Sequence, residues 1–145
     1  MGDFAKDINS TFPNEHVKAM LNIKYTANWF DNIGNEMLKE FNISVQQYNI
    51  LRILRGAGKE ITVKTVKSRM IQKSPNSTRL MDKLCEKDLI RRRRCENDRR
   101  LVYVEISAKG LKLLDKIKIE DLHSEMDSIT ESEAKTLNRI LDKIR

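Results

Sequence analysis

The chain has 145 residues, of which 39% are hydrophobic and only 6% are aromatic. This length suits one domain with a single core built mostly from Leu, Ile, Val and Met, and it argues against two unrelated domains. The formal net charge is +7, which favours a polyanionic partner. Charge alone would also fit a membrane surface or a ribosome.

The surplus positive charge is concentrated in one stretch. From Lys59 to Arg100 there are 14 basic and 6 acidic residues, a net charge of +8, whereas the remainder has 14 basic and 15 acidic residues. Solvated surfaces usually mix the two signs, so this stretch is the first candidate for contact with nucleic acid.

Several classes of protein lack support in the sequence. No apolar run approaches the roughly 18 residues of a membrane span, and the first residues do not have the basic-then-apolar order of a signal peptide. We therefore expect a cytoplasmic protein without a membrane partner, whose two cysteines, Cys85 and Cys95, stay reduced. Phosphate-binding loops, nucleophile elbows and metal-ligand spacings are missing from the sequence, so we expect neither an enzyme nor a cofactor.

The N-terminal third predicts one long helix. Residues 1–12 are expected to form a loose leader, and Pro13 suits the first turn of a helix over residues 13–42. Its apolar positions recur three or four residues apart, which indicates an amphipathic helix. Trp29, Tyr25 and Ile23 lie off the main stripe. A helix with two apolar faces usually has two neighbours, one of which could be another subunit.

Two shorter helices follow. Ser44 and Gln47 predict a capping box at the start of a helix that ends at Gly56 and Gly58. Its expected buried stripe consists of Val45, Tyr48, Leu51 and Leu54. Thr62 predicts the N-cap of a helix over residues 63–71, with Val66 and Met70 facing the core.

A third short helix is predicted from Ser74 to Lys87, with Ser74 as N-cap and Pro75 in the first turn. One face is expected to be buried: Ser77, Leu80, Met81, Leu84 and Cys85. The exposed face then carries Asn76, Thr78, Arg79, Asp82 and Lys83. Two helices in tandem, the second with a polar N-terminal half, form a helix-turn-helix, whose second helix enters the major groove of DNA.

After Asp88 the hydrophobic period falls to about two, which predicts strands over residues 89–95 and 101–106. Residues 96–99 are turn material between them. The pair forms a β-hairpin, or wing, with a basic tip. Ser107 can cap a further helix of about five turns, whose apolar positions are Leu111, Leu114, Ile117, Leu122 and Met126.

Thr130 and Glu133 predict another capping box, at the start of the last helix. Its apolar stripe has heptad-like spacing over only two repeats and consists of Ala134, Leu137, Leu141 and Ile144. That is too short for an independent coiled coil but adequate for packing against a partner helix.

Four motifs in this order resemble the MarR-type transcriptional regulators, dimeric winged helix-turn-helix proteins of bacteria and archaea. The motifs are Thr78-Arg79-Leu80-Met81-Asp82-Lys83-Leu84, Leu89-Ile90-Arg91-Arg92, Asp98-Arg99-Arg100 and Ser107-Ala108-Lys109-Gly110. The resemblance covers residues 43–114 in motif and the flanking helices in pattern. It implies that the N-terminal helix and the last two helices form the dimer interface.

The resemblance also implies roles for single residues. Asn76, Thr78 and Arg79 would reach base edges or phosphates, and Arg99 would enter the minor groove, whose negative potential suits arginine. Asp98 would hold the wing in place. The expected DNA-binding residues are Ser74, Asn76, Ser77, Thr78, Arg79, Lys83, Arg92, Arg94, Asp98, Arg99 and Arg100.

The sequence departs from the family's pattern in two places. Asp88 stands where relatives carry glycine before the first wing strand, so a positive φ there would be less comfortable. Pro75 and Asn76 replace the usual serine and threonine, which leaves the base preference open. The run from Arg91 to Arg94 should alternate between the two sides of a strand, with two members facing phosphates and the others solvated or paired.

Other readings remain open beside this one. Cys85 or Cys95 could be a redox switch, although a buried cysteine, as Cys85 is expected to be, usually behaves as a small apolar residue. His16 and His123 could bind a metal ion, but two histidines without an acidic cluster are a poor ligand set. An RNA-binding or protein-docking winged helix without an effector is the remaining alternative.

We therefore expect a mainly α protein with a small β-hairpin wing, forming one domain over residues 1–145. Residues 44–106 would be the winged helix-turn-helix, flanked by dimerisation helices at 13–42 and 108–145. The expected function is a homodimeric regulator, a repressor of a palindromic operator in double-stranded DNA. Its affinity would be tuned by a small-molecule effector bound between the dimer helices and the winged region.

Overall fold

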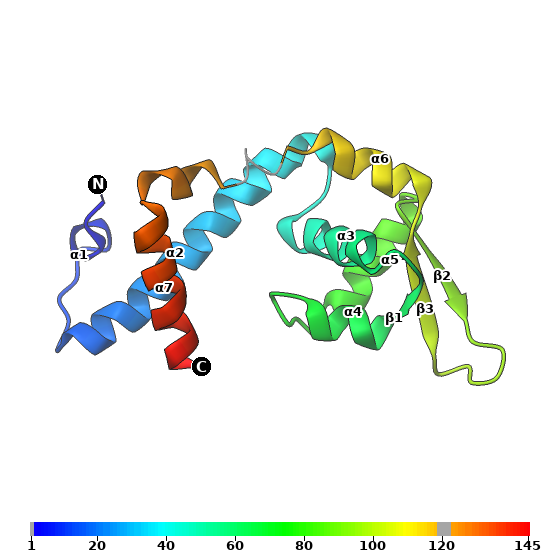
Figure 1. Ribbon diagram of the computed structural model, residues 1–145, viewed down its shortest axis with the longest axis horizontal. Coiled ribbons are helices and arrows are strands. Elements are labelled where there is room, and N and C mark those ends of the chain that lie inside the picture. The colour runs from blue at the N-terminus through cyan, green and yellow to red at the C-terminus, as the bar shows by residue number, and fades with distance from the viewer. Residues whose placement is uncertain (1, 119–122) are drawn as a thin grey trace.

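The computed structural model describes residues 2–118 and 123–145 as a winged unit flanked by helices (Figure 1). Helix α2 (Glu15–Leu38) runs away from the winged unit, and α7 (Glu131–Ile144) is the last helix of the chain. The winged unit contains α3 (Val45–Ala57), β1 (Ile61–Thr62), α4 (Val63–Arg69), α5 (Ser77–Glu86), β2 (Ile90–Arg94) and β3 (Val102–Ile106). Helix α6 (Ala108–Lys116) leads back toward the C-terminal end of α2. The mainly helical fold with a small antiparallel sheet is therefore confirmed.

The long first helix is confirmed, but it is shorter than predicted at both ends: α2 ends at Leu38, and Lys39–Phe41 form the 3-10 helix η1. Asn14 is the N-cap of α2 and accepts a bond from Val17 N at 3.0 Å, so Pro13 precedes the helix and does not occupy its first turn. The expected loose leader contains a short helix, α1 (Phe4–Asp7). Phe4 is buried against α2 and stacks on Phe12 with ring centroids 5.2 Å apart. These aromatic contacts hold α1, which the weak helical pattern of residues 1–12 did not reveal.

The core of the winged unit lies between α3, α4, α5 and the sheet. The Ser44 capping box is present, and the left-handed Gly58 ends α3. Leu51 and Leu54 are buried as expected, whereas Val45 and Tyr48 only border the core. The other buried members include Ile50, Val66, Met70, Met81, Leu84, Ile90 and Val104. These side chains fix one face of α5 against α3 and leave its opposite face outward.

The sheet has three strands rather than the two of the expected hairpin. β3 pairs antiparallel with β2 on one side and with the short β1 on the other. Ile61 of β1 stands opposite Val104, and Ile90 of β2 stands opposite Ile106. A strand of two residues has too little periodicity to be detected in a sequence, because alternation needs at least about four positions.

Asp88, which stands where the family's pattern has glycine, lies in the connection between α5 and β2, and its backbone has a left-handed conformation. Asp88 has φ of 58°, a value that glycine adopts more easily than aspartate. Ser107 caps α6 through a bond from Gly110 N at 3.0 Å, and its hydroxyl donates to Asp88 O at 2.5 Å. The start of α6 therefore supports the left-handed turn directly.

The C-terminal region departs most from expectation. Helix α6 ends at Lys116, so the predicted five-turn helix is wrong beyond that residue, and Leu122 lies outside the described residues. Ile117 has an extended backbone, and Met126 belongs to the short 3-10 helix η3 (Ser124–Ser128). The Thr130 capping box of α7 is confirmed. Among the described residues, no helix combines the length and apolar composition needed to cross a membrane.

Candidate nucleic-acid interface

Helix α5 presents its polar side outward, as the spacing predicted. Met81 and Leu84 are fully buried, and the expected outer residues are exposed: Asn76, Thr78, Arg79, Asp82 and Lys83. This arrangement places hydrogen-bonding groups and positive charge along one accessible face. The N-terminal end of that face is where a helix lying in the major groove contacts bases.

The helix begins at Ser77 with Asn76 at the N-cap position, so the prediction of Ser74 as N-cap and Pro75 in the first turn is wrong by two residues. Ser74 instead forms a turn that precedes the helix: its hydroxyl accepts from Asn76 N at 3.1 Å, and its carbonyl accepts from Ser77 N at 3.2 Å. Ser77 is only 1% exposed, and its hydroxyl donates to Ser74 O at 2.9 Å. Ser77, which we expected to contact DNA, thus supports the turn from inside.

The tip of the wing is held by Asp98. Its carboxylate accepts from Arg100 N at 3.0 Å and Arg100 Nε at 3.3 Å, and its carbonyl accepts from Leu101 N at 2.9 Å. Arg99 and Arg100 are both exposed. Asp98 therefore shapes the tip, and Arg99 is carried on the shaped turn.

The four consecutive arginines divide between two sides of the sheet. Arg92 reaches back to α5, where it pairs with Asp82 at 2.6 Å and donates to Thr78 O at 3.2 Å. Its buried Nε has no protein partner among the described residues. Arg92, which was predicted as a DNA contact, thus links the wing to α5. Arg94, also predicted, is exposed on β2.

On the other face, Arg93 donates two bonds to Glu60, at 2.5 and 3.2 Å, and its guanidinium lies 5.0 Å from the centre of the Tyr103 ring. These bonds lower the pKa of the Glu60 carboxyl below its ordinary value. The trio joins the segment before β1 to both strands of the wing. Sequence reasoning missed Glu60, because its partner lies 33 residues away.

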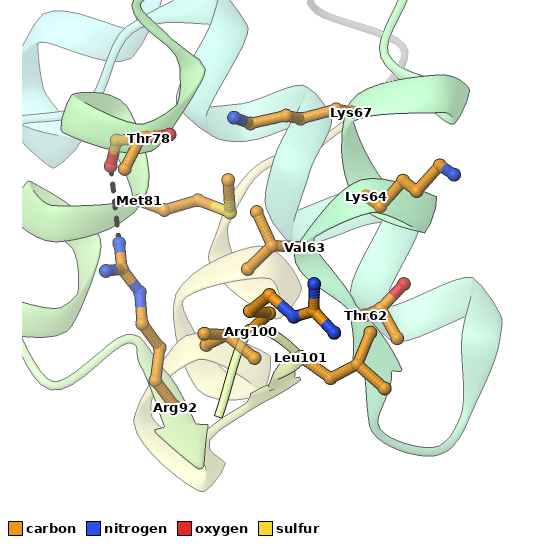
Figure 2. Close-up of a pocket in the computed structure, with 10 residues that line it drawn as sticks. Thr62, Val63, Lys64, Lys67, Thr78, Met81, Arg92, Arg100 and Leu101 are labelled. Carbon is orange, nitrogen blue, oxygen red and sulfur yellow. Dashed lines mark hydrogen bonds between the residues drawn. The ribbon is translucent and has the colours of Figure 1, made fainter. Parts of the chain in front are cut away.

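A cavity of about 390 Å³ lies between α4, α5 and the wing (Figure 2). Val63, Met81 and Leu101 contribute its apolar wall. Four positive side chains also line it: Lys64, Lys67, Arg92 and Arg100. In Figure 2, Arg92 points to Thr78, the Lys64 amine extends away from the centre, and the Lys67 side chain extends toward the side of Thr78. Lys64 and Lys67 are exposed three residues apart on α4, a spacing that could have marked them as phosphate contacts beforehand.

The cysteines and histidines do not gather into a site. Burial raises the pKa of the Cys85 thiol, which reduces the thiolate needed for oxidation. Cys85 borders the core, as a small apolar residue would. In the described part of the chain, no three His, Cys, Asp or Glu side chains lie where they could share a metal ion.

Comparison with known proteins decides the family. Residues 32–117 match the family described as transcriptional regulator SarA/Rot, and this match covers more than half of the chain. The chain belongs to the SarA/Rot family of transcriptional regulators. The matched residues include α3, the helix-turn-helix and the wing.

Relatives of this SarA/Rot family member are also regulators. The HTH-type transcriptional regulator MgrA of Staphylococcus aureus is 27% identical over 112 residues, which span 77% of this chain and 76% of MgrA. The HTH-type transcriptional regulator PecS of Dickeya dadantii is 26% identical over 120 residues, spanning 79% and 72% of the two chains. These relatives are regulators rather than enzymes.

Solved structures that are similar to this chain include MarR proteins. A mutant MarR from E. coli, complexed with operator DNA, is 27% identical, with 99% of each chain covered and a TM-score of 0.72. A MarR transcription factor from Planctomyces limnophilus is 29% identical, covering 91% and 98% of the chains, with a TM-score of 0.70. The expected resemblance to MarR-type regulators is confirmed.

Proposed function

We propose that this SarA/Rot family member is a sequence-specific repressor that binds double-stranded DNA as a homodimer. The observation that carries the proposal is the joint exposure of the polar side of α5 and the arginines of the wing tip, inside a stretch of net charge +8. Positive charge supplies affinity for phosphates, and side chains that reach base edges supply sequence preference. The complex of the mutant E. coli MarR with operator DNA supports the same mode of binding.

Each part of the surface has a distinct task in this proposal. Asn76, Thr78 and Arg79 read bases from the N-terminal half of α5, and Arg99 enters the minor groove. The remaining contacts go to phosphates, from Lys83, Arg94 and Arg100, with Lys64 and Lys67 added on α4. Arg92, Asp98, Ser74 and Ser77 support these groups through the bonds described above.

The dimer is proposed from the apolar surface of the flanking helices, residues 13–42 and 108–145. No residue of α7 is buried within the chain, although the helix has an apolar stripe. Ile140 and Ile144 are 45% and 66% exposed, and Trp29 on α2 is 42% exposed. Exposed apolar side chains on both helices favour a partner, and a second copy supplies the same side chains by symmetry.

An effector site is proposed where α2 meets the end of α6. A cavity of about 220 Å³ opens there, lined by residues 37–41 at the end of α2 and 116–118 at the end of α6. Met37, Phe41 and Ile117 give it apolar walls, while Lys116 and Lys118 can attract an acidic group. A ligand that prefers one arrangement of α2 and α6 shifts the spacing of the two α5 helices, and thereby DNA affinity.

Selection of bound duplexes from a random pool tests the proposal. We expect an inverted repeat whose half-sites lie about one helical turn, ~10 base pairs, apart. Sedimentation of the free protein should show a dimer. Equal affinity for every recovered duplex, together with a monomer in solution, would contradict the regulator and favour a general nucleic-acid-binding or docking module.

A further inference from the structure

The loop between α4 and α5, residues 70–76, is tied to two other helices by side-chain hydrogen bonds. Gln72 Nε2 donates to Asp31 Oδ2 of α2 at 2.5 Å, and Gln46 Nε2 of α3 donates to Gln72 Oε1 at 2.5 Å. Beside them, Ile71 N donates to Asn49 Oδ1 of α3 at 3.1 Å. The loop lies on the side of the winged unit that faces α2 (Figure 1).

The chemistry of the three side chains fixes the direction of this chain of bonds. The ionised carboxylate of Asp31 can only accept, so the amide of Gln72 must turn its NH₂ group toward Asp31. The Gln72 carbonyl oxygen then faces Gln46 and accepts from it. Asp31, Gln72 and Gln46 are each partly buried, and a bond to a charged acceptor in such a site is stronger than a neutral one.

The bonded residues stand at the contact between α2 and α3. One turn after Asp31, Gly34 lies so close to α3 that an added Cβ would be 2.7 Å from Val45 Cγ2. Asn35 Oδ1 accepts from Val45 N at 2.9 Å. Because these contacts are close, a tilt of α2 against α3 must displace Asp31 relative to Gln46.

The loop leads from Gln72 straight to the base-reading end of α5. Two residues after Gln72, Ser74 bonds to Asn76 and Ser77 and so sets where α5 begins. Met70, before Gln72, is buried in the core. The position of Gln72 is therefore transmitted to Asn76 and its neighbours through only a few residues of backbone.

We propose that Gln72 is a positioning residue that couples the tilt of the long helix α2 to the placement of the N-terminal end of α5 on DNA. This inference rests on the proposed function as a dimeric DNA-binding regulator. The contact with Asp31 is made across 41 residues of sequence. When α2 changes its angle in the dimer, Asp31 moves Gln72 through their hydrogen bond. The N-terminal ends of the two α5 helices then change their separation.

An exchange of the two partner groups tests the proposal. In Gln72→Glu the new carboxylate faces the Asp31 carboxylate, so the bond is replaced by repulsion. In the double variant Asp31→Asn with Gln72→Glu, the amide at position 31 can donate to the carboxylate at position 72, and Gln46 can still donate to it. Asp31→Asn alone keeps an acceptor for Gln72 and should change DNA affinity by less than about twofold.

The readout is affinity for the selected operator and for operators whose half-sites are moved one base pair closer or farther. Gln72→Glu should lower operator affinity about tenfold, within the range of coupling mutations, and should reduce the preference for the original spacing. The double variant should restore both. A contact that serves stability alone would weaken binding to all spacings by one factor.

Ile71→Glu is the matched control, because it adds the same charge one residue away on a side chain that is 86% exposed. Gln72→Met removes the bond without adding charge and serves if Gln72→Glu does not fold as a dimer. The inference is overturned if Gln72→Glu and Gln72→Met keep the spacing preference of the unaltered protein, or if the double variant gives no rescue. If the unaltered protein binds no duplex selectively, the proposed function itself fails.

Discussion

Arg99 and Arg100 are neighbours at the tip of the wing, but only Arg100 is held by the carboxylate of Asp98. Arg99 is exposed on the turn that this carboxylate shapes. A guanidinium presented on an ordered turn loses less freedom on binding than one on a loose loop. The difference supports the proposal that Arg99 enters the groove, while Arg100 supports the tip and contacts nearby phosphates.

Arg99→Ala should therefore weaken operator binding by about 1–3 kcal/mol without changing the dimer. Fluorescence anisotropy at moderate salt measures the affinity, and sedimentation measures the oligomeric state. Lys112→Ala, which removes one exposed positive charge from α6, is the control for a general loss of charge. An affinity loss no greater than that of the control would refute the role of Arg99 in the minor groove.

Arg79 lies on the exposed side of α5, one residue after Thr78. If it reads a base, Arg79→Ala should cost about 1–3 kcal/mol on the selected operator and relax the preference at one position of each half-site. Affinity should be compared across a set of single-base operator changes. An equal loss on every sequence, with a salt slope lower by about one, would make Arg79 a phosphate contact.

Single residues were predicted best where the local rule is strong. The caps at Ser44, Ser107 and Thr130 and the exposed side of α5 follow from short-range sequence, although the cap expected at Ser74 lies at Asn76. The question of a positive φ at Asp88 came from the family resemblance. Arg92 was expected at the DNA surface, yet it pairs with Asp82. Ser77 was expected both on the buried face of the helix and among the DNA contacts, and it is buried. A partner ten residues distant, such as Asp82 for Arg92, leaves no periodic signal.

At the scale of elements, the packing of α6 on the winged unit depends on a missing side chain. A Cβ at Gly110 would clash with Leu89 O and lie 2.7 Å from Ile106 Cγ1. Because Leu89 O is backbone, the clash cannot be relieved by a rotamer change. The start of α6 thus packs closely against Leu89, which precedes β2, and against Ile106 at the end of β3.

Gly110→Ala should lower the free energy of unfolding by about 1–3 kcal/mol or more through overpacking. Gly56→Ala is the matched control: it lies within α3, and an added Cβ there meets nothing within 4 Å. That change should stabilise the protein by about 0.5–1 kcal/mol, since alanine favours helix over glycine. Urea unfolding of both variants gives the comparison, and an equal effect of the two would contradict the close fit.

The order and type of the main elements were predictable, because capping boxes and hydrophobic periodicity act over a few residues. The helix expected after Ser107 was too long: α6 ends at Lys116, where Ile117 turns to an extended backbone. Met126, which was expected in the same helix, lies in the 3-10 helix η3. α1 and β1 were missed because both are held by contacts with distant residues.

At the scale of the whole molecule, the chain leaves apolar side chains exposed on two helices, although Phe4 packs on Tyr25 of α2. The sequence already indicated a second face on α2 and a stripe on α7, and both lie exposed in the structure. Which residues meet across the dimer depends on the relative placement of two copies, and no pattern within one chain specifies that. The proposed interface therefore rests on exposure and symmetry.

Leu137→Glu tests whether α7 holds two copies together. Leu137 lies on the apolar stripe and is 42% exposed in the single chain. Burying a carboxylate against a second apolar face is costly, so the variant should dissociate at concentrations where the unaltered protein is dimeric. Operator affinity should fall by at least about tenfold, since one half-site then binds without its linked partner.

Ser132→Glu adds the same charge to the first turn of α7, away from the stripe, where a carboxylate suits the helix dipole. This control should remain dimeric and keep its operator affinity. Sedimentation and anisotropy measured on both variants separate loss of assembly from loss of DNA contact. A Leu137→Glu protein that stays dimeric and binds the operator normally would exclude α7 from the interface and leave α2 as the surface to test next.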